Sequence, residues 1–252
     1  MNKKPLTYIL SSLILINVVV LLKFDKVFSA PSLNLSLGDS TKPNDVSTTL
    51  QIIIFLTILS LAPSILILMT SFTRILIVLG FVRNALGTQQ MPPNQILIGL
   101  ALFLTFFIMA PVGTNIYNQS YVPYTKGQIT SQEALKRAET PIKDFMLKNT
   151  RSKDLKLFMD LGKIDNNTDI KKLPIHVVVP AFVISELKTA FEMGFIIYVP
   201  FLVIDIVVAS TLMSMGMLMI PPVMISLPFK ILLFILVDGW GLVVESLVTS
   251  FK

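Results

Sequence analysis

Four long apolar blocks dominate the sequence and restrict the folds that it can adopt. They cover residues 50–69, 96–112, 195–220 and 223–251. Each block is near or above the length of about 20 residues that a helix needs to span a bilayer. Only 14% of the residues are charged, against about 25% in a typical soluble domain. The sequence therefore predicts an all-α, membrane-associated protein built from helical hairpins, with proline pairs at the turns.

The N-terminal segment has the layout of a bacterial secretory signal. Two lysines precede an apolar stretch over residues 6–22, and small residues follow at Ser29 and Ala30. This pattern predicts a cleavable signal peptide over residues 1–30. The alternative is an uncleaved anchor helix, although its apolar core is short for a spanning segment. Residues 31–49 are polar and predict a short periplasmic arm.

The rest of the chain divides into three parts. Residues 50–112 predict a first helical hairpin, residues 113–174 a polar helical domain, and residues 175–252 an amphipathic helix followed by a second hairpin. About half of the 21 Lys and Arg residues lie in the polar domain, mixed with acidic residues. If the signal is exported, the polar domain lies in the periplasm and the short basic turns of both hairpins lie in the cytoplasm, as the positive-inside rule expects.

Local signals predict three helices in the polar domain. Thr130 and Glu133 match a capping box at the start of the first helix. Thr140 directly before Pro141 predicts a second helix start, because proline is favoured at the first helical position. Apolar residues near 155–159 give a third helix its buried face.

Charged residues recur in or beside the apolar blocks. They are Arg74, Glu186, Lys188, Glu192, Asp205, Asp238 and Glu245. Each charge at the centre of a bilayer costs about 2.5–3.5 kcal/mol, so such groups normally face protein or water. A chain of this length is too short to shield them all, and we expect neighbouring subunits to do so. The alternative is that these segments lie at the membrane surface and extend their charged ends into water.

The helix predicted over residues 181–194 is amphipathic. Its polar residues lie on one face at helical spacing, and they are Ser185, Lys188, Thr189 and Glu192. A polar face on a helix within apolar surroundings predicts polar contacts with another element.

Methionines occupy every second position from Met213 to Met219, and Pro221-Pro222 follow. Thioether side chains are flexible and apolar, and they adapt to irregular surfaces. The proline pair ends the helix at this point. Together these features indicate a deformable hydrophobic constriction, and ordinary filling of a core by methionine is the alternative.

Catalytic and cofactor signals are missing from the sequence. It has no cysteine, and its single histidine, His176, has no nucleophile at a recognisable spacing. No glycine-rich phosphate-binding pattern occurs, and the carboxylates are too scattered for a metal site. The net charge is +6, but the basic residues do not form a face with interleaved aromatics, as a nucleic-acid interface would. We therefore expect no enzyme activity, no cofactor and no nucleic-acid partner.

Two long strings resemble signatures of the FliP family of flagellar export proteins. Residues 72–112 read FTRILIVLGFVRNALGTQQMPPNQILIGLALFLTFFIMAPV. Residues 180–247 read PAFVISELKTAFEMGFIIYVPFLVIDIVVASTLMSMGMLMIPPVMISLPFKILLFILVDGWGLVVESL. The signal-like N-terminus and the polar domain favour the flagellar branch over the homologous proteins of virulence injectisomes.

The resemblance implies a non-enzymatic pore subunit in the bacterial inner membrane, at the flagellar basal body. Such subunits assemble in several copies with FliQ and FliR into a helical export gate, and they work beside FlhB and FlhA. Unfolded flagellar subunits pass through the gate. In assemblies of this family, many of the helices lie outside the bilayer. Charged residues on such helices would not contact lipid.

The resemblance also assigns roles to particular residues. The family's methionine-rich gasket corresponds to Met215, Met217, Leu218 and Met219, where Leu218 departs from the all-methionine pattern. We expect inter-subunit polar contacts from Arg74, Arg83, Glu186, Lys188 and Asp205. The rival interpretation is a proton- or ion-coupled transporter that uses Asp205 and Asp238 as carriers, although the sequence shows no inverted repeat around them.

Overall fold

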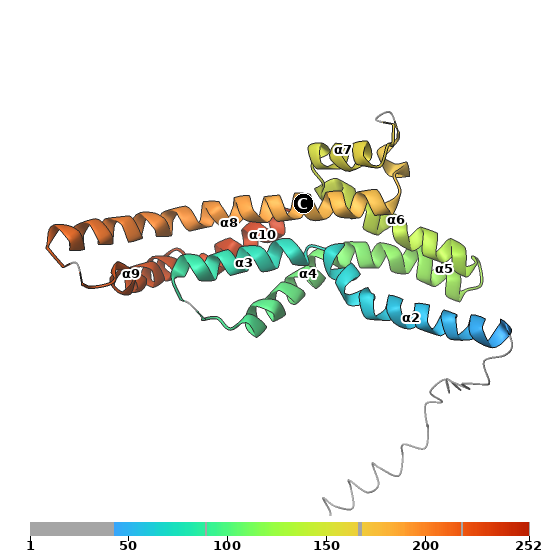
Figure 1. The fold of residues 1–252 in the computed structure, drawn as a ribbon, viewed down its shortest axis with the longest axis horizontal. Coiled ribbons are helices and arrows are strands. Elements are labelled where there is room, and N and C mark those ends of the chain that lie inside the picture. The colour runs from blue at the N-terminus through green and yellow to red at the C-terminus, as the bar shows by residue number, and fades with distance from the viewer. Residues whose placement is uncertain (1–42, 89, 166–167, 218, 252) are drawn as a thin grey trace, which may run out of the picture. The chain divides into compact units, whose positions relative to one another are not determined.

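The computed structural model describes residues 43–88, 90–165, 168–217 and 219–251, and all regular elements within these ranges are helices (Figure 1). In chain order they are α2 (Pro43–Leu68), α3 (Phe72–Leu86), α4 (Asn94–Ile116), the π-helix η1 (Tyr117–Tyr121), α5 (Val122–Thr125), α6 (Ser131–Asn149), α7 (Ser152–Leu161), the 3-10 helix η2 (Ile170–Lys172), α8 (Ile175–Ser214), α9 (Pro222–Leu236) and α10 (Gly239–Thr249). The predicted all-α fold is confirmed. The predicted signal peptide over 1–30 and the predicted gasket residue Leu218 lie outside the described residues.

Contacts along the backbone divide the chain into two units, Met1–Leu56 and Thr57–Lys252. The described part of the first unit is the beginning of α2. The second unit contains the rest of α2 and every other described helix, which pack together within this unit.

α8 is a single helix of 40 residues that contains Pro180 and Pro200. At 1.5 Å per residue it is about 60 Å long. The amphipathic helix predicted over residues 181–194 begins directly after Pro180, as the rule that proline breaks helices would suggest, and this boundary is wrong. Packing overrides the rule here, because the buried residues Val178 and Phe182 lie on either side of Pro180 and hold the chain in helical form.

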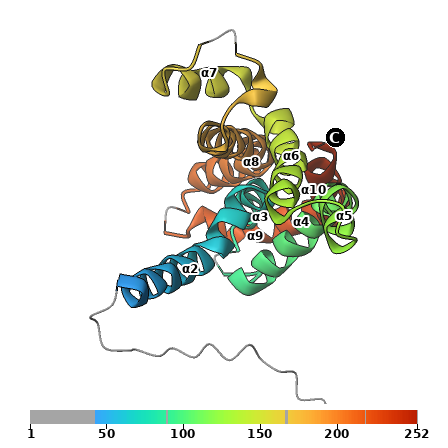
Figure 2. The ribbon, with the colours of Figure 1, turned by 90° about the vertical axis from the view of Figure 1, so that its right-hand side faces the viewer.

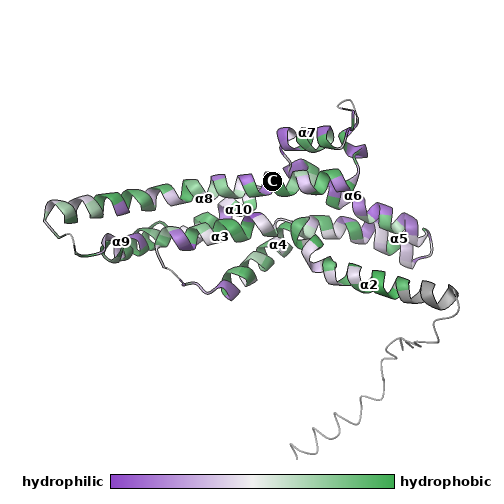
Figure 3. Ribbon diagram, in the orientation of Figure 1, coloured by the Kyte–Doolittle hydropathy of each residue, from purple (hydrophilic) through white to green (hydrophobic). Residues whose placement is uncertain are grey.

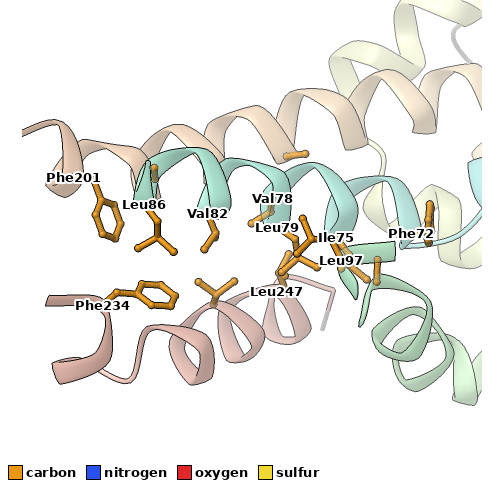
Figure 4. Packing of buried hydrophobic residues seen from close by; sticks show 14 of the residues in the cluster. Phe72, Ile75, Val78, Leu79, Val82, Leu86, Leu97, Phe201, Phe234 and Leu247 are labelled. Atoms are coloured by element: carbon orange, nitrogen blue, oxygen red, sulfur yellow. The ribbon is translucent and has the colours of Figure 1, made fainter. Parts of the chain in front are cut away.

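α3 lies at the centre of the unit, with α4, α8, α9 and α10 around it, as the end-on view shows (Figure 2). Its apolar residues recur at helical spacing and are fully buried at Ile75, Val78 and Val82. Phe201 from α8 and Phe234 from α9 face each other at the Leu86 end of the same core (Figure 4). α3, which is short and moderately amphipathic, is thus the helix against which the others pack.

α6 and α7 pack on the first turns of α8 through a second apolar cluster. Its buried residues include Met146, Leu155, Met159 and Phe182. Figure 3 shows polar residues concentrated on α6 and α7, whereas α4, α8 and α9 are mostly apolar. The polar segment therefore contacts the apolar helices through an apolar base.

The structure tests the local helix signals of the polar segment. Thr130 is the N-cap of α6 and its side chain accepts a hydrogen bond from the backbone N–H of Glu133, as predicted. The predicted helix start at Thr140 is wrong, since Pro141 lies inside α6. Leu155 and Met159 form the buried face of α7, as predicted.

Two helices among the described residues are long and apolar enough to cross a membrane, namely Asn94–Thr125, in which η1 and α5 continue α4, and Ile175–Ser214. The pair α9 and α10 gives a third span if it counts as one, although a bend of 63° separates the two helices. The sequence predicted four such segments. By this criterion the apolar part of α2, Ile52–Ile65, is too short to count.

Candidate functional site

The buried carboxylate of Glu186 is neutralised inside the chain. Arg74 Nε donates to Glu186 Oε2 at 2.9 Å, and Nη2 donates to Oε1. Arg74 Nη1 donates to the carbonyl oxygen of Ser250 at 3.0 Å and to its Oγ at 2.9 Å. The guanidinium also lies 3.8 Å from the ring centroid of Phe251. Arg74 on α3 and Glu186 on α8 were both expected to contact another subunit. In this structure they connect α3, α8 and the end of α10 within one chain.

Asp205 on α8 has two partners on α9. Lys230 Nζ donates to Asp205 Oδ2 at 2.6 Å, and Ser226 Oγ donates to Oδ1 at 2.6 Å. The Lys230 side chain is almost fully buried. It also lies beside Gly87, which ends α3 in the left-handed conformation, and a positive charge near a helix C-terminus is favourable. This network fixes α9 against α8.

The polar face of α8 binds Arg151, in the turn between α6 and α7. Arg151 Nη1 donates to Glu192 Oε1 at 3.0 Å, Nη2 donates to both Glu192 Oε2 and Thr189 Oγ1, and the backbone N–H donates to Ser185 Oγ. Ser185 in turn donates to the buried Asp154 at 2.8 Å. The hydrogen bond with Glu192 raises the pKa of the Arg151 guanidinium above its ordinary value. Sequence periodicity predicted this polar face, but it gave no signal for Arg151 as its partner.

Arg83 and Lys188 differ from the residues above. Arg83 Nη1 donates to Asn94 Oδ1 at 2.5 Å and to the carbonyl oxygen of Pro92 at 3.4 Å, and it stabilises the connection between α3 and α4. Its Nε is buried without a partner among the described residues. Lys188 is exposed on α8 and has no hydrogen bond or ion pair with any described residue.

The methionine-rich turn joins α8 to α9. α8 ends in a Schellman motif, in which the Met217 N–H donates to the Leu212 carbonyl and the Gly216 N–H donates to the Met213 carbonyl. Gly216 has φ +73°, a conformation that favours glycine. Met215 is 71% exposed and Met219 is 97% exposed. The described methionines of this turn thus form an apolar surface with flexible side chains, which the described part of the chain leaves uncovered.

The carboxylates of the rival transporter interpretation do not share a site. The carboxylate of Asp205 accepts hydrogen bonds from Lys230 and Ser226. Asp238 stands at the bend between α9 and α10 with φ +50°, where it begins α10. No cluster of His, Asp and Glu that could hold a metal ion occurs in the ranges that the structure describes.

Comparison with known proteins gives a consistent result. The profile of the FliP family matches residues 55–247. The chain is 60% identical to the flagellar biosynthetic protein FliP of Bacillus subtilis (strain 168), over 86% of this chain and 98% of that protein. It is 50% identical to flagellar biosynthetic protein FliP of Aquifex aeolicus (strain VF5), over 93% and 98% of the two chains, and 49% identical to that of Pectobacterium carotovorum subsp. carotovorum, over 89% and 90%. With a profile match over most of its length and relatives of this similarity, the chain belongs to the FliP family.

Proposed function

We propose that this chain is a pore subunit of the flagellar type III export gate, which passes unfolded flagellar subunits across the bacterial inner membrane. Its relatives carry the name flagellar biosynthetic protein, and its apolar helices suit a membrane-associated assembly. In this proposal several copies assemble with FliQ and FliR, beside FlhB and FlhA in the basal body. The chain has no catalytic role, and its polar segment over residues 113–174 lies in the periplasm.

The observation that carries the proposal is the exposed methionine turn. Met215, Met217 and Met219 lie together in one short turn and remain exposed in the single chain. Exposed apolar surface of this kind marks an interaction site rather than a stable surface in water. In a ring of copies, such turns would meet around one axis, and flexible thioethers would close around a chain of varying side-chain size. We assign the gasket to these three methionines together with Leu218.

Uncovered apolar faces on the long helices support an assembly of several subunits. Phe195, Ile196 and Ile206 on α8 are more than half exposed, as are Ile235 and Leu236 on α9. Lipid or neighbouring subunits must cover these faces. In an assembly that holds part of the helices above the bilayer, neighbouring subunits would cover these apolar faces.

The charged residues divide between two roles in this proposal. Arg74, Glu186 and Asp205 fix the chain's own helices, which holds the methionine turn at a constant position relative to α3. Arg83 fixes the connection between α3 and α4. Lys188 is the member of the set that remains available for a contact between subunits.

Replacement of Met217, Leu218 and Met219 by alanine tests the gasket. We expect the variant to assemble normally and to leak small ions across the membrane, because three shortened side chains leave the constriction open. Membrane conductance, measured in cells or in planar bilayers, reports the leak. Met91→Ala is the control, because Met91 is also an exposed methionine but lies in the turn between α3 and α4. Unchanged conductance in the triple variant would refute the gasket.

The transporter interpretation predicts that a single chain functions without partners. A coupled transporter works as a self-sufficient chain and moves its ion or solute when it is reconstituted alone in liposomes. Asp205→Asn would then abolish transport without any effect on assembly. The ion pair between Asp205 and Lys230 instead predicts that this change weakens the contact between α8 and α9.

A further inference from the structure

Three charged side chains on the C-terminal helices have no hydrogen bond or ion pair with any described residue. They are Lys188 on α8, Asp238 at the bend before α10, and Glu245 on α10, and all three are exposed. The other charges on these helices are paired within the chain. Since an unpaired charge in contact with lipid is costly, such groups normally face water or protein, and these three are available to a partner outside this chain.

Glu192 is a carboxylate near Lys188 in the same chain. Glu192 lies one helical turn further along α8 and attracts Lys188 over a distance. Both oxygens of Glu192, however, already accept hydrogen bonds from Arg151. Lys188 is therefore left without a direct partner among the residues that the structure describes.

Lys188 and Glu245 stand at nearly the same level along the helices. Arg74 binds both Glu186 on α8 and Ser250 at the end of α10, so these two residues lie side by side. α8 and α10 run in opposite directions (Figure 1). Measured from the Arg74 contact at 1.5 Å per residue, Lys188 is displaced by about 3 Å and Glu245 by about 7.5 Å in the same direction.

The same rule separates Asp238 from Lys188. Asp238 precedes Ser250 by a distance of about 18 Å along the helix, if α10 and the residue before it are taken as straight. Its level therefore differs from that of Lys188 by about 15 Å. Glu245 is the carboxylate whose level fits.

A cleft between α8 and α10 lies next to the Arg74 contact. It has a volume of about 560 Å³, and Thr189 from α8 and Ser246 from α10 both line it. Lys188 and Glu245 directly precede these two residues in the sequence. The two charged residues are therefore each one position away from the lining of one cleft, on different helices.

Each of the two charges lies within an exposed apolar strip. Phe191 and Phe195, three and seven residues after Lys188, are 55% and 63% exposed. Leu242, three residues before Glu245, is 55% exposed. An aromatic-rich apolar surface with few charges is typical of the centre of a protein interface.

We propose that Lys188 of one copy forms an ion pair with Glu245 of the neighbouring copy. The inference rests on the proposed assembly of several copies. Copies related by rotation about an axis parallel to α8 keep every residue at its level, so matching levels are the condition under which a cation and a carboxylate on different helices can meet across a head-to-tail interface. Charge complementarity supports a second copy as the occupant of this face, and in this proposal the pair fixes its register.

Site-specific crosslinking tests this contact, because the natural chain contains no cysteine. Two tagged chains, one carrying Lys188→Cys and the other Glu245→Cys, are expressed together and treated in membranes with a short bis-maleimide. A bifunctional reagent is needed since the Cα atoms of an ion pair are farther apart than a disulfide allows. We expect a covalent dimer of the two tagged chains. The matched control combines Lys188→Cys with Asp238→Cys, for which we expect none.

Charge reversal provides the second measurement on the full-length protein. Lys188→Glu alone places two carboxylates together, and we expect the oligomeric fraction to fall about tenfold. Lys188→Glu with Glu245→Lys restores the pair and the oligomer, whereas Lys188→Glu with Asp238→Lys does not.

The outcomes separate this inference from the proposed function. A wild-type chain that stays monomeric overturns both. A wild-type oligomer without the crosslink between positions 188 and 245, or one that the exchange at Asp238 rescues, overturns the ion pair and leaves the gate proposal intact.

Discussion

Arg74 and Glu186 meet between α3 and α8 although 112 positions separate them in the sequence. The pair is almost completely buried, so its desolvation is costly and its geometry must offset that cost. Two hydrogen bonds to one carboxylate and two to Ser250 provide that geometry. The arrangement lets an apolar helix carry an acidic residue without a partner from another subunit.

Glu186→Ala tests the energetic role of this pair. The variant leaves the buried Arg74 guanidinium uncompensated, so we expect a loss of about 3–5 kcal/mol in the free energy of unfolding. Arg74→Met combined with Glu186→Leu removes both charges and should recover most of this loss. Thermal unfolding of the solubilised chain measures the effect.

Arg137→Ala is the control for this experiment. Arg137 forms an exposed ion pair with Glu133 one turn away on α6, and such pairs contribute about 0–1 kcal/mol. If Glu186→Ala is no more harmful than Arg137→Ala, the buried pair does not hold α3 to α8.

At the scale of the elements, local signals predicted some helix boundaries and failed at others. The Thr130 cap was predictable because its partner, the Glu133 N–H, lies three residues away. The starts predicted at Pro141 and after Pro180 were wrong, because both prolines lie inside helices that packing supports. A local rule therefore holds where its physical partners are local and fails where distant contacts decide.

The attachment of α7 to α8 depends on Arg151. Arg151→Ala removes the hydrogen bonds to Glu192 and Thr189 but keeps the backbone bond to Ser185. Since both partners of the ion pair are partly exposed, we expect a loss of only about 1 kcal/mol. Hydrogen exchange should show faster opening of α7, with α3 unchanged. Equal protection of α7 in the variant and the wild type would contradict this role.

The methionine turn depends on the left-handed backbone of Gly216. Gly216→Ala should cost about 1–2 kcal/mol through φ alone, because a Cβ there meets no atom within 4 Å. We expect local disorder of the turn and an ion leak similar to that of the alanine variant of the gasket. Gly80→Ala is the matched control, since Gly80 lies in α3 with equally open surroundings and no positive φ. A leak caused by both substitutions would show that the backbone of the turn is not its source.

At the scale of the whole molecule, the sequence predicted the class of fold and the family, but not how the charges are distributed. Apolar block length and proline pairs are properties of the sequence itself, so the helices and the methionine turn could be located. The partners of Asp205 and Arg74 depend on how helices pack, which periodicity alone does not encode. Lys188 is the predicted contact residue that has no partner in the described part of the chain.

The length of α8 also has a consequence for the assembly. A helix of about 60 Å is twice as long as the hydrocarbon core of a bilayer, at about 30 Å. Its first half carries the Arg151 and Arg74 networks, and its second half carries exposed apolar residues up to the methionine turn. Neighbouring subunits are the partners that could cover a helix of this length along its whole extent.

The native mass of the detergent-solubilised chain, expressed alone and then together with FliQ and FliR, tests the proposed gate most directly. The proposal predicts a homo-oligomer that incorporates both partners. A stable monomer that ignores them would contradict it and would favour the transporter interpretation built on Asp205 and Asp238.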